Sequence, residues 1–156
     1  MATRDELYAV MISLASDTLL LPNAAVAEVV AADAMIRNDP GQGPEWLLGY
    51  YNWNARRVPA LSLEAMNGQP RPPTSRRERL IVVNSLGTKL TGGVIAFLAQ
   101  SYPHLITLNR AAIRSLPLHP GDRSELVLTR VKIANSEALI PDFETIESEL
   151  VAAGAS

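Results

Sequence analysis

The hydrophobic pattern divides the chain into short apolar runs separated by turn-forming residues. The runs 7–14 and 18–21 flank the polar pair Ser16-Asp17, and Pro22 ends the second run. Apolar runs of this length bounded by turn residues predict strands, and two of them around a short turn predict a hairpin. Similar pairs follow at 80–83 with 92–97, and at 126–133 with 138–140.

Helix signals are weaker and shorter, except at the end of the chain. The segment after Asn23 combines helix formers with valines on one side, which predicts a short capped helix over 24–30. One helical turn is expected over 64–68, and a short helix over 109–115. Asp142 followed by apolar residues at helical spacing predicts a C-terminal helix.

Many short strands with few helices indicate a β-rich barrel or sandwich. The expected core consists of apolar residues that recur in the strand-like or short helical runs. These residues are Leu20, Val29, Leu48, Val58, Leu61, Val82, Val94 and Ile133.

Length and proline content suggest a single domain made of two halves. A chain of 156 residues has the size of one ordinary domain. The segment 69–74 contains three prolines, which exclude helix and central strand and predict a linker between the halves.

The most distinctive segment is 44–63, PEWLLGYYNWNARRVPALSL. Two strand-like runs flank the polar residues 54–57, which predicts another hairpin with a four-residue turn.

This segment resembles the signature of the CheW family of chemosensory coupling proteins. That signature has a glycine, an apolar pair, Asn-Leu-Arg-Gly, and an apolar strand that contains Pro and ends near Asp-Leu. The matching positions here are Gly49, Asn52, Pro59 and Leu63. The departures are Trp53, Asn54 and Ala55, which replace the family's Leu, Arg and Gly. The similarity extends through nearly the whole chain, and it is weakest over 101–124.

The resemblance implies a fold and a role. CheW-like domains consist of two intertwined five-stranded SH3-like β-barrel subdomains with short helices and a C-terminal helix, so 1–156 would be one such domain. They are non-catalytic adaptors without cofactors, which couple the cytoplasmic tip of a chemoreceptor to the regulatory domain of a CheA-type histidine kinase. The pattern Pro-Glu-Trp-x-x-Gly-Tyr-x-Asn-Trp-Asn looks like the ChpC-type adaptors of type IV pilus chemosensory systems, which control twitching motility.

The resemblance also implies a partner-binding surface. Its Val-x-Glu element contributes to the groove for the receptor tip, and its Asn-Leu-Arg-Gly turn contributes the second region. Carried over to this chain, the expected partner-binding residues are Val26, Glu28, Gly49, Asn52, Asn54, Arg56 and Arg57. Asn54 cannot supply the positive charge of the family's arginine, and Ala55 disfavours a positive φ, so a different turn type is expected.

Composition argues against several other classes of protein. A formal charge of -2 gives no bias toward nucleic acid or an anionic membrane, and the absence of cysteine excludes disulfides and thiolate metal sites. Leu7 to Leu14 is read as a strand instead of a signal sequence, and no apolar run is long enough to span a membrane. A cytoplasmic location is expected, with membrane association only through receptor arrays.

Residues for catalysis are sparse. His104 and His119 lack the spacing of a zinc site, no Gly-x-Ser-x-Gly turn presents a nucleophile, and no phosphate-binding loop is present. Two alternatives to the adaptor stay open. One is a divergent array paralogue that acts as a spacer or competitor, which the loss of arginine at Asn54 suggests. The other is a small β-barrel enzyme or ligand-binding protein, which a deep polar pocket containing a histidine would favour.

Overall fold

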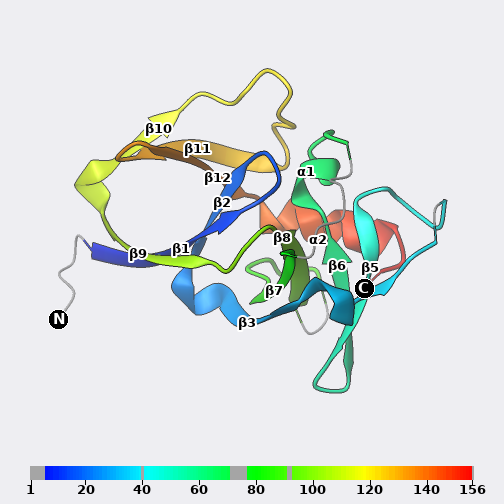
Figure 1. The fold of residues 1–156 in the computed structure, drawn as a ribbon. Helices are drawn as coiled ribbons and strands as arrows, with labels where there is room; N and C mark the ends of the chain where they lie inside the picture. Colours follow the sequence, from blue (N-terminus) through cyan, green and yellow to red (C-terminus); the bar gives the residue numbers. More distant parts are fainter. Residues whose placement is uncertain (1–5, 40, 71–76, 91–92, 156) are drawn as a thin grey trace.

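A computed structural model describes residues 6–39, 41–70, 77–90 and 93–155. Its strands form two six-stranded sheets (Figure 1). In spatial order, sheet A contains β10 (Ile113–Leu116), β11 (Val127–Ile133), β12 (Ser136–Pro141), β2 (Thr18–Pro22), β1 (Glu6–Ser13) and β9 (His104–Asn109). Sheet B contains β3 (Val26–Ala31), β7 (Arg79–Asn84), β8 (Val94–Ala99), β6 (Arg56–Leu61), β5 (Leu47–Trp53) and β4 (Ile36–Arg37).

The helices are few and short. The two α-helices are α1 (Leu63–Met66) and α2 (Phe143–Ala152), and the 3-10 turns are η1 (Asn23–Ala25), η2 (Ala32–Ala34) and η3 (Arg110–Ala112). The mainly β fold with a C-terminal helix is thereby confirmed. Each sheet has six strands instead of five, because the short edge strands β4 and β10 pair with β5 and β11.

The two sheets have the same topology. In each sheet, a 3-10 turn joins the two edge strands, as β3-η2-β4 in sheet B and β9-η3-β10 in sheet A. In each, an α-helix follows the strand that pairs in parallel with its neighbour, α1 after β6 and α2 after β12. We call sheet A with α2 subdomain A, and sheet B with α1 subdomain B. The two sheets therefore correspond strand by strand, although the equivalent strands occur at different points along the chain.

Hydrophobic residues form one core between the sheets and one inside each sheet. The shared core joins residues of both sheets, for example Ile12 and Phe97, with Ile146 and Leu150 of α2. Of the eight predicted core residues, six are buried, whereas Val29 and Ile133 are half-buried. Val29 lies on the edge strand β3 and Ile133 next to a hairpin turn, so each is covered less completely than a central residue.

Two predicted helices are wrong. The segment 24–30 forms only the turn η1 and then strand β3, and the segment 109–115 forms η3 and then β10. β-Branched side chains suit a pleated sheet, and β3 pairs antiparallel with β7 over the valines that had suggested a helical face. Asn109 does cap as expected, since its side chain accepts a hydrogen bond from the N–H of Ala111.

The other two helix predictions are confirmed. Ser62 caps α1, which Asn67 and Gly68 end, and Gly68 has a positive φ of 90°. Asp142 caps α2 by accepting a hydrogen bond from the N–H of Glu144. Both signals are local, so the sequence carries them directly.

Each helix holds a loop of the other subdomain through a buried carboxylate. Glu64 on α1 accepts hydrogen bonds from two N–H groups and a hydroxyl of the β1–β2 turn, and Glu147 on α2 does the same for the β7–β8 loop. The donors are the N–H groups of Ala15 (2.8 Å) and Ser16 (2.6 Å) to Glu64, those of Lys89 (2.7 Å) and Leu90 (2.8 Å) to Glu147, and the hydroxyls of Ser16 and Ser85. The two subdomains are therefore fastened reciprocally.

Residues 71–74 of the predicted linker lie outside the described residues. No helix in the described part of the chain is long and apolar enough to cross a membrane.

Candidate partner-binding site

The β5–β6 hairpin extends beyond the rest of sheet B, and its tip projects at the bottom of the view in Figure 1. The last pair of the ladder is Trp53 with Arg56, so the turn consists of Asn54 and Ala55 alone. Both have positive φ, 49° and 63°. A two-residue turn with two left-handed residues is of type I′, whose twist matches that of the flanking strands.

The turn corrects two expectations. Arg56 and Arg57 belong to strand β6, so the turn has two residues where four were expected. Ala55 does adopt a positive φ although it lacks glycine's freedom, at a cost of about 1–3 kcal/mol. The hairpin geometry therefore overrides the preference of this residue.

Gly49 is buried where β5 pairs antiparallel with β4, directly opposite Arg37. A Cβ atom at this position would lie 2.1 Å from the carbonyl oxygen of Ile36 and 2.8 Å from Cα of Arg37. Both are backbone atoms, which cannot move aside without displacing β4. The signature glycine consequently shapes the base of the hairpin.

We expect Gly49→Ala to lower the free energy of unfolding by about 1–3 kcal/mol, because it overpacks backbone against backbone. Urea denaturation followed by circular dichroism measures the loss. Gly121→Ala is the matched control, since a Cβ there meets no atom within 4 Å and the residue has no positive φ. Equal stability of the Gly49 variant and the control would contradict this account of Gly49.

The two arginines of the hairpin point to opposite faces. Arg57 is opposite Asn52 and lies over the ring of Tyr50, with its guanidinium carbon 3.7 Å from the ring centroid. Tyr50 packs against the shared core between the sheets. Arg56 is opposite Trp53, which packs against the core inside sheet B. Arg57 therefore lies on the face toward subdomain A, and Arg56 on the inner face of sheet B.

Val26 and Glu28 show the same division on edge strand β3. Val26 is half-buried and packs against the shared core. Glu28 is exposed and pairs with Val82, whose side chain belongs to the core inside sheet B. Because paired residues share a face, Glu28 projects on the same face as Arg56.

The expected site is thus divided into two groups. Val26, Asn52 and Arg57 border the face toward subdomain A, whereas Glu28 and Arg56 lie on the other face. The strands β7, β8 and β6 separate β3 from β5 in the sheet order, a span of about 19 Å along the sheet. The side chain of Asn52 is exposed and has no hydrogen-bond partner among the described residues.

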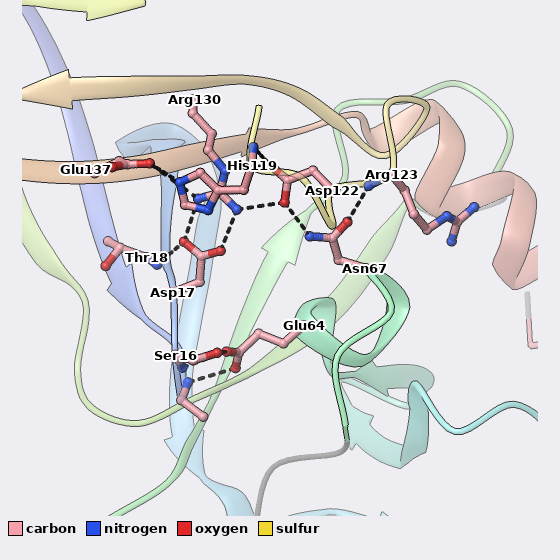
Figure 2. Close-up of polar contacts among 11 residues, drawn as sticks. Ser16, Asp17, Thr18, Glu64, Asn67, His119, Asp122, Arg123, Arg130 and Glu137 are labelled. Carbon is pink, nitrogen blue, oxygen red and sulfur yellow. Dashed lines mark hydrogen bonds and ion pairs between the residues drawn. The ribbon is translucent and has the colours of Figure 1, made fainter. Parts of the chain in front are cut away.

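A polar cluster missed by the sequence analysis lies between the subdomains (Figure 2). At its centre is Arg130 of β11, whose side chain is only 2% exposed. It donates to both oxygens of Asp17 (3.0 and 2.8 Å) and to both oxygens of Asp122 (2.7 and 2.9 Å). Two carboxylates thus share one guanidinium.

The charges in this cluster stabilise one another. Hydrogen bonds, above all from Arg130, hold the pKa of Asp122 well below its usual range against the opposing effect of burial. The same carboxylates, chiefly Asp122, raise the pKa of Arg130. Asp122 and Arg130 are therefore both ionised near neutral pH.

The cluster continues into both helices. The side chain of Asn67, just after α1, donates to Asp122 at 3.0 Å and accepts from the N–H of Arg123 at 2.8 Å. Arg123 in turn donates to the carbonyl of Met66 (2.9 Å) and pairs with Glu149 on α2 at 2.7 Å, which raises the pKa of Arg123. A continuous polar chain thus joins β11, α1 and α2.

A cavity of about 260 Å³ adjoins this cluster and is lined by Ser16, Glu64, His119 and Asp122 among others. A polar pocket with a histidine was the feature that would favour an enzyme. Its serine, however, donates to Glu64, and His119 contacts Glu137 at 2.5 Å. His104, the second histidine, lies on β9 and not at this cavity. A serine–histidine pair is therefore not assembled here.

The sequence contains few signals that predict this cluster. Arg130 occupies a position in an alternating strand where a solvated charge is the usual interpretation, and Asp17 is 113 residues away. The one available signal is the sequence Gly121-Asp122-Arg123, a charged turn just before that strand.

Comparison with known proteins agrees with this geometry. A family model described as CheW-like domain matches residues 9–150. Among solved structures, the crystal structure of scaffolding protein TtCheW from Thermoanaerobacter tengcongensis is similar, with a TM-score of 0.68 and 21% identity, covering 87% of this chain and 88% of that one. No curated protein gives a significant match. The chain belongs to the CheW-like domain family.

Proposed function

We propose that this chain is an adaptor that couples the cytoplasmic tip of a chemoreceptor to the regulatory domain of a CheA-type histidine kinase. Its family supports a non-catalytic scaffolding role in chemosensory signalling. The observation that carries the proposal is the projecting β5–β6 hairpin, which presents Arg57 over Tyr50 beside the shared core.

Arg57 takes over the role of the family's arginine, whose position is occupied by Asn54 in this chain. Its guanidinium lies over the face of Tyr50, and this cation–π contact restricts its rotamers before a partner arrives. A pre-positioned guanidinium retains its planar array of donors for a receptor carboxylate. The hairpin can therefore still supply a positive charge, three residues from the usual position.

The seven predicted residues have different roles in this proposal. Val26 offers partly buried apolar area, and Asn52 and Arg57 offer polar contacts on the same face. Glu28 and Arg56 lie on the other face of sheet B, outside the contact surface that we assign to the receptor. Gly49 and Asn54 set the path of the hairpin and do not themselves provide charge.

The kinase would dock on one barrel, through its homologous regulatory domain. The whole chain would act as one domain, since the carboxylates of Glu64 and Glu147 fasten the two subdomains together. The sequence of the hairpin supports membership of the ChpC-type branch. The adaptor would then act in the cytoplasm, at receptor arrays that control type IV pili. The alternative is a spacer or competitor in the receptor array that has lost one partner. The replacement of the family's arginine by Asn54 suggests this alternative.

Reversing the charge of Arg57 should weaken binding to a receptor tip by about tenfold, while Arg56→Glu should change it little, because only Arg57 lies on the face toward subdomain A. Surface plasmon resonance with an immobilised cytoplasmic hairpin fragment of a chemoreceptor measures the affinity of each variant. The two arginines are adjacent in sequence and equally charged, so each is the matched control for the other.

Thermal unfolding of both variants should remain near that of the wild type, because exposed substitutions change stability by only ~0.5 kcal/mol. Equal losses for both variants would show that the charge of the tip matters and its face does not. Wild-type affinity in both would remove the hairpin from the interface. Asn54→Arg then asks whether the usual position still adds affinity.

A further inference from the structure

An apolar cavity of about 310 Å³ opens at one end of sheet A. Its floor is formed by Ala9, Leu20 and Leu108, which are 4–6% exposed, and Ile113 and Ile140 form its walls. Among the lining residues that the structure describes, the hydroxyl of Tyr8 at the mouth is the one polar side-chain group. A water molecule needs two to four polar partners, so the interior of this cavity disfavours water.

Comparison with sheet B, which has the same topology, explains why this space in sheet A is empty. Ala31, just before η2, pairs with Arg79, and Asn109, just before η3, pairs with Glu6. Counting along β7 and β1 from these two pairs, Leu80 and Val82 of sheet B correspond to Leu7 and Ala9 of sheet A.

Sheet B fills the corresponding space with its own side chain. Leu98 of β8 pairs with Leu80 and is buried in the core inside sheet B. In sheet A, the pairing of β2 with β1 ends at Pro22, opposite Ala9, so β2 supplies no residue opposite Leu7. A missing leucine and a valine reduced to alanine together account for the empty volume.

The mouth of the cavity is bounded on one side by Leu86, which is 55% exposed. Leu86 lies in the β7–β8 loop, which the carboxylate of Glu147 holds against α2. The loop limits the width of the entrance, so the cavity suits a small molecule that fits entirely inside it.

We propose that this cavity binds a small, uncharged apolar molecule about the size of indole. Small-molecule sites typically have volumes of about 300 Å³ or more and are mainly apolar. An apolar cavity of ~150 Å³ is already large enough to bind benzene in another protein. None of the lining side chains that the structure describes carries a charge, and a charged ligand would lose its hydration without compensation. Such a ligand would sit in subdomain A, apart from the β5–β6 hairpin.

Indole itself is the probe. We expect it to raise the thermal midpoint of the 156-residue chain in a saturable manner, with one molecule bound per chain by isothermal titration calorimetry. Ala9→Leu fills the floor and should weaken binding by at least about tenfold. Leu128→Ala removes a 60% exposed apolar side chain elsewhere and is the control, with unchanged binding expected.

A variant at the rim of the cavity tests the site even if Ala9→Leu fails to fold. Leu86→Phe changes only an exposed side chain and should weaken binding by narrowing the mouth, with the thermal midpoint of the free protein preserved. Absent or non-saturable binding by the wild type would overturn the proposal, as would equal binding by Ala9→Leu. Binding that appears only after deletion of residues 1–5 would also overturn it, because the chain itself would then be the occupant.

Discussion

Replacing Arg130 with alanine should lower the free energy of unfolding by about 3–5 kcal/mol, one of the largest effects expected for a single residue in this chain. The substitution leaves Asp17 and Asp122 facing each other without the guanidinium that both accept from. The side chain of Asp122 is only 4% exposed, so water cannot replace the lost hydrogen bonds fully. Urea denaturation at pH 7 measures the change.

The pH dependence separates charge from packing. The pKa of Asp122 is lowered in the folded protein, so its contribution to stability is present above its unfolded pKa of ~4 and is lost as the pH falls through its folded pKa. The difference between wild type and Arg130→Ala should therefore shrink below about pH 4. Arg114→Ala, which removes an exposed arginine from neighbouring strand β10, should cost no more than ~0.5 kcal/mol. A constant difference from pH 7 to pH 2 would assign the effect to packing.

Phe97→Ala should also cost about 3–5 kcal/mol, for a different reason. Phe97 on β8 is fully buried in the shared core and packs edge-to-face on Phe143 of α2, with ring centroids 6.2 Å apart. The substitution opens a cavity between the subdomains. Differential scanning calorimetry measures the loss and shows whether the chain still unfolds in one transition.

A single transition at a lower midpoint is the expected outcome for Phe97→Ala, because the clamps at Glu64 and Glu147 still join the subdomains. Val151→Ala on the exposed side of α2 is the control and should leave the midpoint nearly unchanged. A loss below 1 kcal/mol for Phe97→Ala would mean that the shared core does not hold the two sheets together.

Features encoded within a few residues could be predicted from the sequence. The cap at Asp142, the helical turn of α1 and the strands flanking Asn54 depend on neighbours close in the chain, and the structure contains all of them. The CheW-like signature then supplied the two-subdomain fold, which periodicity alone could not distinguish from a simple sandwich.

Features decided by distant partners could not be predicted. The valines of β3 fit a short helix and a strand equally well, and pairing with β7, some fifty residues later, decided between them. The buried ion pair of Arg130 could not be predicted because its partner Asp17 is 113 residues away. The positive φ of Ala55 likewise follows from strand register and not from the preference of alanine.

The candidate site shows the same limit. The sequence placed Arg56 and Arg57 together among the expected partner-binding residues. Only the register of β5 and β6 places them on opposite faces and puts Arg57 over Tyr50. A shift of one residue in that register would exchange their roles.

Reconstitution from purified components tests the adaptor role most directly. The 156-residue chain is mixed with the regulatory domain of a CheA-type kinase and a chemoreceptor cytoplasmic fragment from the same genome, and the complexes are measured by sedimentation velocity. We expect the chain to bind each partner alone and to bring both into one complex that does not form without it. Failure to bind either partner at micromolar concentrations would contradict the adaptor role.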